Sequence, residues 1–392
     1  MLTKLSEATW PTSGGKASVL GVLLREGMPV PDGFVVSDGD QSVSSVAAHS
    51  FRDVVALELQ ELGNPIVAVR SSAAGEDSAD ASAAGQYESI IGVHSVDDVC
   101  QAIATCRKSA LAARVGDYWR RTGGPSRHAL GPSPHTPGMA VLVQPVIEAD
   151  ASGVMFTPQR GGPTRIEASW GLGLAVVGGT VTPDTYEVTS NGTIRCVVGS
   201  KQTRIDLDHE RGGVATSLVA PDKRTARALD DATITALVDL GGRIATMLDG
   251  PQDIEWSVED GGVWILQARP ITAALPASRV HGSADHAEDL NGTPGSHGQV
   301  TAVARIVRSP SDFSSVHRGD IVVCPYTDPA WTPLFTIAAG VVTETGGALS
   351  HAAIVAREYG IPAVLGVDSA TTRIEDGARI TLNGTAGTIT VL

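Results

Sequence analysis

The stretch Val341–Gly366, which reads VVTETGGALSHAAIVAREYGIPAVLG, limits the folds open to this chain more than any other. A β-branched run opens the stretch and predicts a buried strand. Gly346 and Gly347 then break the strand, because two adjacent glycines let the backbone take conformations closed to other residues. Ser350 is a favourable N-cap, and His351 follows it at the first position of a predicted helix.

This helix is predicted to run through about Glu358 and to be followed by a second apolar strand, Ala363–Leu365. The order places a histidine where free backbone N–H groups and the helix dipole favour an anion. Neutral imidazole has an unperturbed pKa near ~6.5 and is nucleophilic at cellular pH, so His351 can carry a phosphoryl group. From these residues alone, an ordinary histidine at the start of a helix is the alternative.

The composition is that of a globular protein with room for two or three domains. The chain has 392 residues, of which 42% are hydrophobic and 18% charged. Its net charge is −14 and no basic cluster stands out, so we expect it to bind neither nucleic acid nor an anionic membrane. The N-terminus lacks the apolar core of a signal peptide, and no apolar run is long enough to span a bilayer. The four cysteines show no CxxC or zinc spacing, which predicts reduced thiols and a cytoplasmic protein.

A glycine pair precedes a predicted helix near the N-terminus. Gly14, Gly15 and Lys16 would direct one cation and several N–H groups at a phosphate. The GxxxxGK[ST] spacing of a Walker A loop is absent. Taken alone, the motif is therefore a weak indication of a nucleotide contact.

A second candidate site begins at Arg70, which ends a predicted buried strand beside a loop of small residues. A guanidinium group can bind phosphate through two parallel hydrogen bonds. The alternative is a surface ion pair from Arg70 to Glu76 or Asp77. A second small-residue loop, which contains Gly85 and leads to Ser89, continues the segment.

A β-hairpin is predicted where two strands flank the sequence Glu-Asp-Gly-Gly. Alternation puts Asp253 and Glu255 on one face of the first strand, and Gln267 and Arg269 on one face of the second. Such oxygen ligands suit Mg²⁺ bridging phosphates, and the arginine can neutralise charge during transfer. An exposed polar hairpin face is the alternative. Upstream, Gln144 lies within a strongly apolar strand and needs a hydrogen-bond partner.

Together these motifs resemble the phosphoenolpyruvate-utilising enzymes, such as pyruvate phosphate dikinase, pyruvate water dikinase and rifampin phosphotransferase. The stretch around His351 resembles their phosphohistidine signature. The run VAVRSSAAGEDSADASAAGQYES and the phrase DIEW…LQARPIT resemble their ATP-binding domain. The resemblance covers nearly all of the chain, in two blocks. It implies a multidomain protein of α/β and α+β class, with an ATP-grasp nucleotide-binding domain followed by a swivelling β/α phosphohistidine domain.

The resemblance also implies a role for each matching residue. His351 would carry the phosphoryl group, in a loop with Thr345, Gly346, Gly347 and Ser350. ATP would be bound by Lys16, Arg70, Gly85, Ser89, Gln144, Glu255, Gln267 and Arg269. Glu255 and Gln267 would also hold the metal, which is Mg²⁺ or alternatively Mn²⁺.

Three features depart from the family pattern. Ala83 stands where relatives usually have phenylalanine, and Leu174 stands where they commonly have glutamate. The segment 38–64 is shorter than the helical insert usual there. A degenerate ATP-binding module without turnover is the reading that these departures support.

The predicted domains are 1–272 for ATP binding and 295–392 for the phosphohistidine. A polar linker without apolar periodicity, 273–294, joins them and is long enough to let a small domain swing. The chain shows neither the pyruvate-binding barrel of the dikinases nor the antibiotic-binding domain of rifampin phosphotransferase. We therefore expect the acceptor to bind between the two domains or on another polypeptide.

The function implied is that of an ATP-dependent phosphotransferase. It would cleave ATP to AMP and phosphate through a phosphohistidine on His351, and pass the phosphoryl group to a small-molecule acceptor of secondary metabolism or antibiotic modification. The alternative is a phosphohistidine carrier subunit that delivers phosphate to a separate acceptor-binding protein.

Overall fold

A computed structural model describes residues 2–10, 12–37, 45–73, 87–110, 139–159, 161–271, 275–276 and 290–392. The chain forms two compact units. Unit 1 comprises Met1–Pro158, Ile205–Ser217 and Leu229–Thr272, and unit 2 comprises Gln159–Arg204, Leu218–Ala228 and Ala273–Leu392. No helix in the described parts of the chain is both long enough and apolar enough to cross a membrane.

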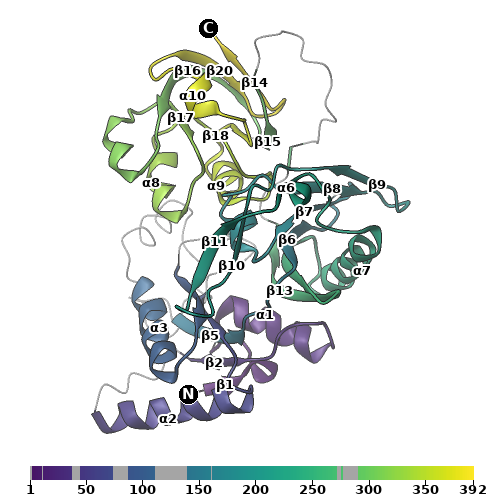
Figure 1. Ribbon diagram of the computed structural model, residues 1–392, viewed down its shortest axis with the longest axis vertical. Helices are drawn as coiled ribbons and strands as arrows, with labels where there is room; N and C mark the ends of the chain where they lie inside the picture. The colour runs from purple at the N-terminus through teal and green to yellow at the C-terminus, as the bar shows by residue number, and fades with distance from the viewer. Residues whose placement is uncertain are drawn as a thin grey trace. The chain divides into compact units, whose positions relative to one another are not determined.

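Unit 1 contains a five-stranded antiparallel sheet with helices packed against it (Figure 1). In spatial order its strands are β1 (Leu2–Lys4), β2 (Phe34–Val36), β5 (Met139–Pro145), β3 (Val67–Ala73) and β4 (Ser89–Val93). The helices of the unit's first half are η1 (Leu5–Glu7), α1 (Gly14–Arg25), α2 (Ser45–Glu61) and α3 (Val96–Ser109). Buried side chains of α2 and α3, such as Val55 and Ile103, pack against Val69 and Val143 of the sheet. This face of the sheet forms an apolar core, and the opposite face, which includes Ser72, packs against α1.

The predicted hairpin is confirmed in unit 1. Strands β12 (Gln252–Glu259) and β13 (Gly262–Pro270) pair antiparallel, and β12 also pairs with β6 (Ala151–Phe156). Helix α7 (Asp231–Met247) contacts both hairpin strands. A separate two-stranded ribbon consists of β10 (Thr203–Leu207) and β11 (Val214–Leu218).

Unit 2 begins with an antiparallel meander of β7 (Thr164–Trp170), β8 (Asp184–Val188) and β9 (Ile194–Val197). The short helices α5 (Leu174–Val177) and α6 (Pro221–Arg224) belong to the same unit.

The C-terminal part of unit 2 forms an eight-stranded mixed sheet. Its central strands β16 to β19 run parallel, and the flanking pairs are antiparallel. In spatial order the strands are β14 (Leu290–Asn291), β21 (Thr388–Val391), β20 (Arg379–Asn383), β16 (Gln299–Ile306), β17 (Ile321–Cys324), β18 (Gly340–Thr343), β19 (Ala363–Leu365) and β15 (Thr293–Ser296). The helices are η2 (Pro310–Ser315), η3 (Pro329–Trp331), α8 (Thr332–Phe335), α9 (His351–Tyr359) and α10 (Ala370–Arg373).

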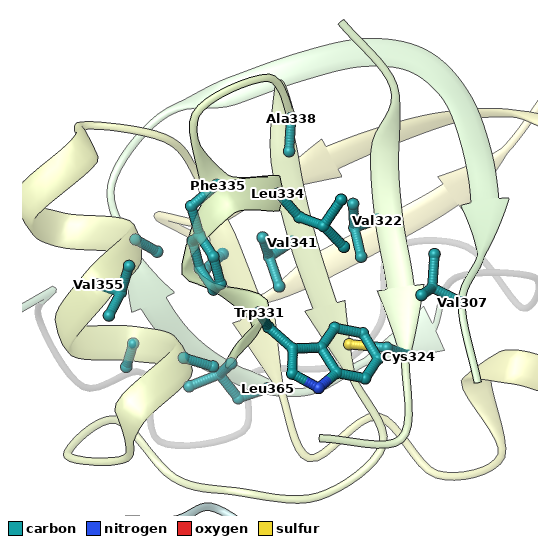
Figure 2. Close-up of a cluster of buried hydrophobic side chains, with 14 of the residues drawn as sticks. Val307, Val322, Cys324, Trp331, Leu334, Phe335, Ala338, Val341, Val355 and Leu365 are labelled. Atoms are coloured by element: carbon teal, nitrogen blue, oxygen red, sulfur yellow. The ribbon is translucent and has the colours of Figure 1, made fainter. Parts of the chain in front are cut away.

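A buried apolar cluster fixes α9 and the end of β18 in unit 2. Figure 2 shows Trp331 and Phe335 pointing into the same cluster as Val341, Val355 and Leu365. Because Val355 comes from α9 and Val341 from β18, this packing holds the two elements that border the histidine loop.

Several local predictions can be compared directly with the structure. Helix α9 begins at His351 and ends in a left-handed residue at Gly360, which confirms the predicted helix. Ser350 occupies the N-cap position, but its hydroxyl donates to the carbonyl of Gly347 at 2.9 Å instead of capping the helix. Strand β14 starts at Leu290, inside the predicted linker, whose residues 273–274 and 277–289 lie outside the described residues. The domain boundaries remain a prediction.

Candidate active site

Three predicted ATP-binding residues share one face of the five-stranded sheet. Residues directly opposite each other in an antiparallel pair lie on the same face, as do residues two apart in a strand. Arg70 pairs with Ser89 on β4 and with Leu142 on β5, and Gln144 is two residues beyond Leu142. Arg70, Ser89 and Gln144 therefore all lie on the face opposite α2 and α3. The predicted neighbour Gly85 lies outside the described residues.

Gln144 has the partner that its burial requires. Its side-chain nitrogen donates to the carbonyl oxygen of Pro31 at 2.7 Å. The side chain is only 4% exposed. This bond fixes the amide beside the turn that leads into β2.

Helix α1, which carries Lys16, is fastened to the same face by a serine that sequence reasoning missed. Ser72, two residues beyond Arg70 in β3, donates to the carbonyl of Ser13 at 2.7 Å and accepts from the N–H of Ala17 at 3.0 Å. Gly14 has φ +73°, and a Cβ there would lie 1.8 Å from the Ser72 carbonyl oxygen. Glycine is thus required at position 14, because only glycine lets the start of α1 approach the backbone of β3 so closely. This approach brings the buried Lys16 to the same face of the sheet.

Arg70 joins the sheet to the hairpin. Its two terminal nitrogens donate to the Leu266 carbonyl at 2.7 Å and to Gln267 Oε1 at 2.6 Å. The second nitrogen also lies 3.3 Å from Glu255 Oε2. Glu255 and Gln267 are directly opposite each other in the hairpin register, so they lie on one face of the hairpin. The structure therefore brings three of the predicted residues together.

Arg269 makes an ion pair two register positions away from Glu255 and Gln267. Its Nε donates to Asp253 Oδ2 at 2.8 Å, and both side chains are buried. Asp253 and Arg269 are also direct partners in the hairpin. The Asp253–Arg269 ion pair thus follows from the hairpin register, which also places Glu255, Gln267 and Arg269 on one face.

The donor set at Glu255 and Gln267 is compatible with a divalent cation. No group of three or more histidine, cysteine or acidic side chains gathers as a metal site in the described ranges. However, Glu255 Oε2 and Gln267 Oε1 both contact the same guanidinium nitrogen of Arg70. The two oxygen ligands therefore point towards one position that a positive charge occupies. Mg²⁺ is commonly held by one or two protein oxygens and completes its shell with water and phosphate.

His351 occupies the first position of α9 with its two ring nitrogens in different environments. Nδ1 lies 3.0 Å from Thr327 Oγ1. Nε2 is buried and has no hydrogen-bond partner in the described part of the chain. The ring also meets Phe335 edge to face, with centroids 6.4 Å apart. In the tautomer with hydrogen on Nδ1, Thr327 accepts that hydrogen and Nε2 keeps its lone pair for reaction.

Burial lowers the pKa of His351 from 6.5 to about 4. The cause is the loss of hydration of the imidazolium form. The imidazole therefore stays neutral, and able to act as a nucleophile, as the pH falls through 6.5 towards 4. Because the folded pKa lies below the unfolded value, the stability from this group is complete above about pH 6.5 and is lost as the pH falls towards 4.

Thr327→Val is expected to slow phosphorylation of His351 by about tenfold. Valine matches the shape of threonine but cannot accept the Nδ1 hydrogen, so the tautomer with a free Nε2 lone pair loses its stabilisation. Incorporation of label from ATP into the protein, measured over time, checks this. The control is Thr336→Val, which removes a hydroxyl that donates to the Pro333 carbonyl. Equal rates in the Thr327 variant and the unchanged protein would contradict the assignment.

The loop before His351 is held by an acidic residue that the sequence did not single out. Glu167 of β7 is fully buried, and its Oε2 accepts the N–H of Leu349 at 3.1 Å. Burial raises the pKa of Glu167 to about 7, against the opposing effects of the Leu349 and Ala348 N–H groups and of Arg165 and Arg357. The available signal was a carboxylate inside a strand otherwise expected to be buried.

The other predicted loop residues lie around the same point. Thr345 Oγ1 donates to the Gly179 carbonyl at 2.6 Å, and the N–H of Gly346 donates to the Val181 carbonyl at 3.1 Å. Gly346 has φ +99°, which only glycine adopts easily. The residues of the predicted loop thus lie together and are held by contacts from the segment 167–182, while their role stays a prediction.

Two protein-family models match the chain. The family model of the pyruvate phosphate dikinase AMP/ATP-binding domain matches residues 42–289, and that of the mobile domain of phosphoenolpyruvate-utilising enzymes matches residues 316–387. The chain therefore belongs to the phosphoenolpyruvate-utilising dikinase family. The predicted fold class, an ATP-grasp domain followed by a phosphohistidine domain, is confirmed.

The similar proteins are longer than this chain. A probable phosphoenolpyruvate synthase of Methanothermobacter thermautotrophicus is 32% identical over 96% of this chain and 61% of its own length. The corresponding protein of Archaeoglobus fulgidus is 33% identical over 97% of this chain and 56% of its own length. The phosphoenolpyruvate synthase of Pyrococcus furiosus is 36% identical over 82% of this chain and 40% of its own length. The chain thus spans between 40% and 61% of these relatives.

Proposed function

We propose that this protein is an ATP-dependent phosphotransferase that forms a phosphohistidine on His351. In the net reaction, ATP, water and the imidazole give AMP, inorganic phosphate and phosphohistidine, which then passes its phosphoryl group to an acceptor. The observation that carries the proposal is the environment of His351, with Nδ1 beside Thr327 and Nε2 without a partner among the described residues. Membership of the dikinase family supports it.

The residues of unit 1 would prepare ATP for this reaction. Lys16, Arg70 and Arg269 would neutralise the triphosphate, and Ser89 and Gln144 would contact the nucleotide from the shared sheet face. Glu255 and Gln267 would hold Mg²⁺, which when bound neutralises charge on the phosphates. Arg70 already contacts both of these oxygens, so we expect it to move towards phosphate when the metal enters.

His351 supplies the nucleophile. The Nε2 lone pair would form the N–P bond to the β phosphorus while the bond from that phosphorus to the oxygen of AMP breaks, which leaves the β and γ phosphates on the histidine. Water would then attack the γ phosphorus, and the bond between the γ phosphorus and the bridging oxygen would break, which releases inorganic phosphate and leaves the phosphohistidine. The buried, neutral ring needs no prior deprotonation near neutral pH, because burial holds its pKa near about 4. The N-terminus of α9 would favour the resulting negative charge.

The names of the relatives suggest which phosphoryl acceptor to test first. Those names describe phosphoenolpyruvate synthases, so pyruvate is the first acceptor to test. They give no support to an acceptor from secondary metabolism or antibiotic modification, nor do they favour a pure carrier subunit. These two ideas rest on the sequence motifs alone.

The test uses the purified chain with Mg²⁺ and ATP labelled at either the β or the γ phosphate. We expect acid-labile protein label from β-labelled ATP, release of label as phosphate from γ-labelled ATP, and formation of AMP. His351→Ala and the closer match His351→Asn should carry no label. Formation of ADP as the only nucleotide product, or equal labelling of the variants, would overturn the proposal. Addition of pyruvate to the labelled protein then tests the acceptor.

A further inference from the structure

One buried carboxyl group lies against the N-terminal end of α9 without being part of the phosphoryl-transfer residues assigned above. Glu167 lies 182 positions before Leu349 in the chain, yet its Oε2 accepts the Leu349 N–H. Its Oε1 is buried and has no hydrogen-bond partner in the ranges that the structure describes. A half-satisfied carboxylate with no exposed surface is costly, so a role beyond stability is worth seeking.

The shape of the histidine loop is adapted to this carboxyl group. A Cβ on Gly347 would lie 2.3 Å from Glu167 Oε2 and 2.4 Å from its Oε1, and the nearest atoms around that position all belong to Glu167. Gly347 does not have the positive φ that Gly346 has. Glycine at 347 is therefore required by Glu167 and not by the backbone conformation.

The loop and the segment 167–182 meet at three points. Besides Glu167, the carbonyl oxygens of Gly179 and Val181 accept from Thr345 Oγ1 and from the Gly346 N–H. The two carbonyl acceptors carry no titratable group, whereas Glu167 does, so only the Glu167 contact can respond to a nearby charge. Arg357 donates to the Ala348 carbonyl at 2.7 Å, so a cation lies on the same loop and partly offsets the carboxylate.

We propose that Glu167 is a positioning residue for the phosphoryl transfer: its carboxyl group binds the backbone of Gly347–Leu349, and negative charge on His351 weakens this contact and releases the loop. The proposal deepens the proposed function and rests on it for the source of that charge. Like charges in a dry site repel strongly, and a phosphoryl group adds negative charge at the first residue of α9. Phosphorylation would thus loosen the loop that it has just modified.

The first test measures hydrogen exchange of the Gly346 and Leu349 amides without ATP. We expect Glu167→Ala to speed exchange of Leu349 by about tenfold or more, and Glu167→Gln to change it little, because the amide oxygen still accepts the N–H. The matched control is Asp376→Asn, which alters a carboxylate that accepts the Ile306 N–H away from the loop. Unchanged Leu349 exchange in Glu167→Ala would overturn the contact.

The second test supplies charge without relying on ATP chemistry. His351→Asp is compared with the neutral His351→Asn, each in the unchanged background and in the Glu167→Gln background. With Glu167 present, the aspartate variant should exchange Leu349 at least about fivefold faster than the asparagine variant, and in the Glu167→Gln background the difference should vanish. Equal exchange in all four proteins would overturn charge-driven release, whether or not ATP phosphorylates His351.

The pH dependence of hydrogen exchange in the loop is a third test. A residue with a purely structural role would not produce it. Because burial raises the pKa of Glu167 to about 7, the docked loop should be most stable at lower pH and should weaken as the pH rises through about 7. Arg165 and Arg357 face the same carboxyl group and stay charged throughout, so they do not produce this change. Loop exchange, corrected for its intrinsic pH dependence, should show the step in the unchanged protein and not in Glu167→Gln.

A double-variant cycle checks the steric half of the argument. Gly347→Ala should displace the carboxyl group and speed Leu349 exchange about as much as Glu167→Ala does, and the two changes together should be no worse than either alone. Additive effects would mean that residues 347 and 167 act independently, which would overturn the proposal.

Discussion

Arg70→Met is expected to slow phosphohistidine formation on His351 by about 10²–10³-fold. The guanidinium group donates to the Leu266 carbonyl and to Gln267, and it lies beside Glu255. Its loss would remove one cation from the proposed triphosphate site and the tie between β3 and the hairpin. Rapid-quench measurement of protein label from β-labelled ATP gives the rate.

Two further variants sharpen this result. Arg70→Lys keeps the charge but cannot reach three oxygens with a planar fork, so it should still lose about tenfold or more. Arg25→Met is the matched control, because Arg25 lies in the last turn of α1 and donates to the carbonyls of Ser6 and Ala8. Labelling of Arg70→Met within about threefold of the unchanged rate would exclude Arg70 from the transfer step.

Elements with a strong local signal could be predicted from the sequence. The start of α9 followed from Ser350 before a helical pattern, and Gly360 ends it in the left-handed conformation. The β12–β13 hairpin followed from two alternating strands around Asp260 and Gly261, both of which have positive φ. Because side-chain alternation is a property of every strand, the common face of Glu255 and Gln267 came with the hairpin.

Contacts between distant segments could not be predicted in this way. Thr327 and His351 meet across 24 positions, and Glu167 and Leu349 across 182. No local pattern encodes such pairs, because they depend on how segments that are distant in the sequence pack together in the fold. The N-cap role predicted for the Ser350 side chain was also wrong. Its hydroxyl donates to the carbonyl of Gly347 and accepts no helix N–H group.

The same limit applies to Asp184, whose partners Lys201 and Ala228 lie 17 and 44 positions further along the chain. In the structure it is completely buried in unit 2 and forms an ion pair with the completely buried Lys201. Asp184 also accepts from the N–H groups of Gly199 at 2.8 Å and Ala228 at 2.7 Å, and from the Tyr186 hydroxyl at 3.1 Å. One carboxylate thus joins the loop before β10 and the segment after α6 to β8.

Asp184→Asn is expected to destabilise unit 2 by about 3–5 kcal/mol, because it leaves the Lys201 ammonium group buried without its counter-charge. Urea unfolding followed by circular dichroism measures the loss. Asp97→Asn is the control, since its pair with Arg52 is exposed and should contribute less than about 1 kcal/mol. If the unpaired ammonium is the cause, Asp184→Asn combined with Lys201→Met should be more stable than Asp184→Asn alone. A double variant no more stable than the single one would instead place the cost in the hydrogen bonds to Gly199, Ala228 and Tyr186, which the Asp184→Asn change affects in both variants.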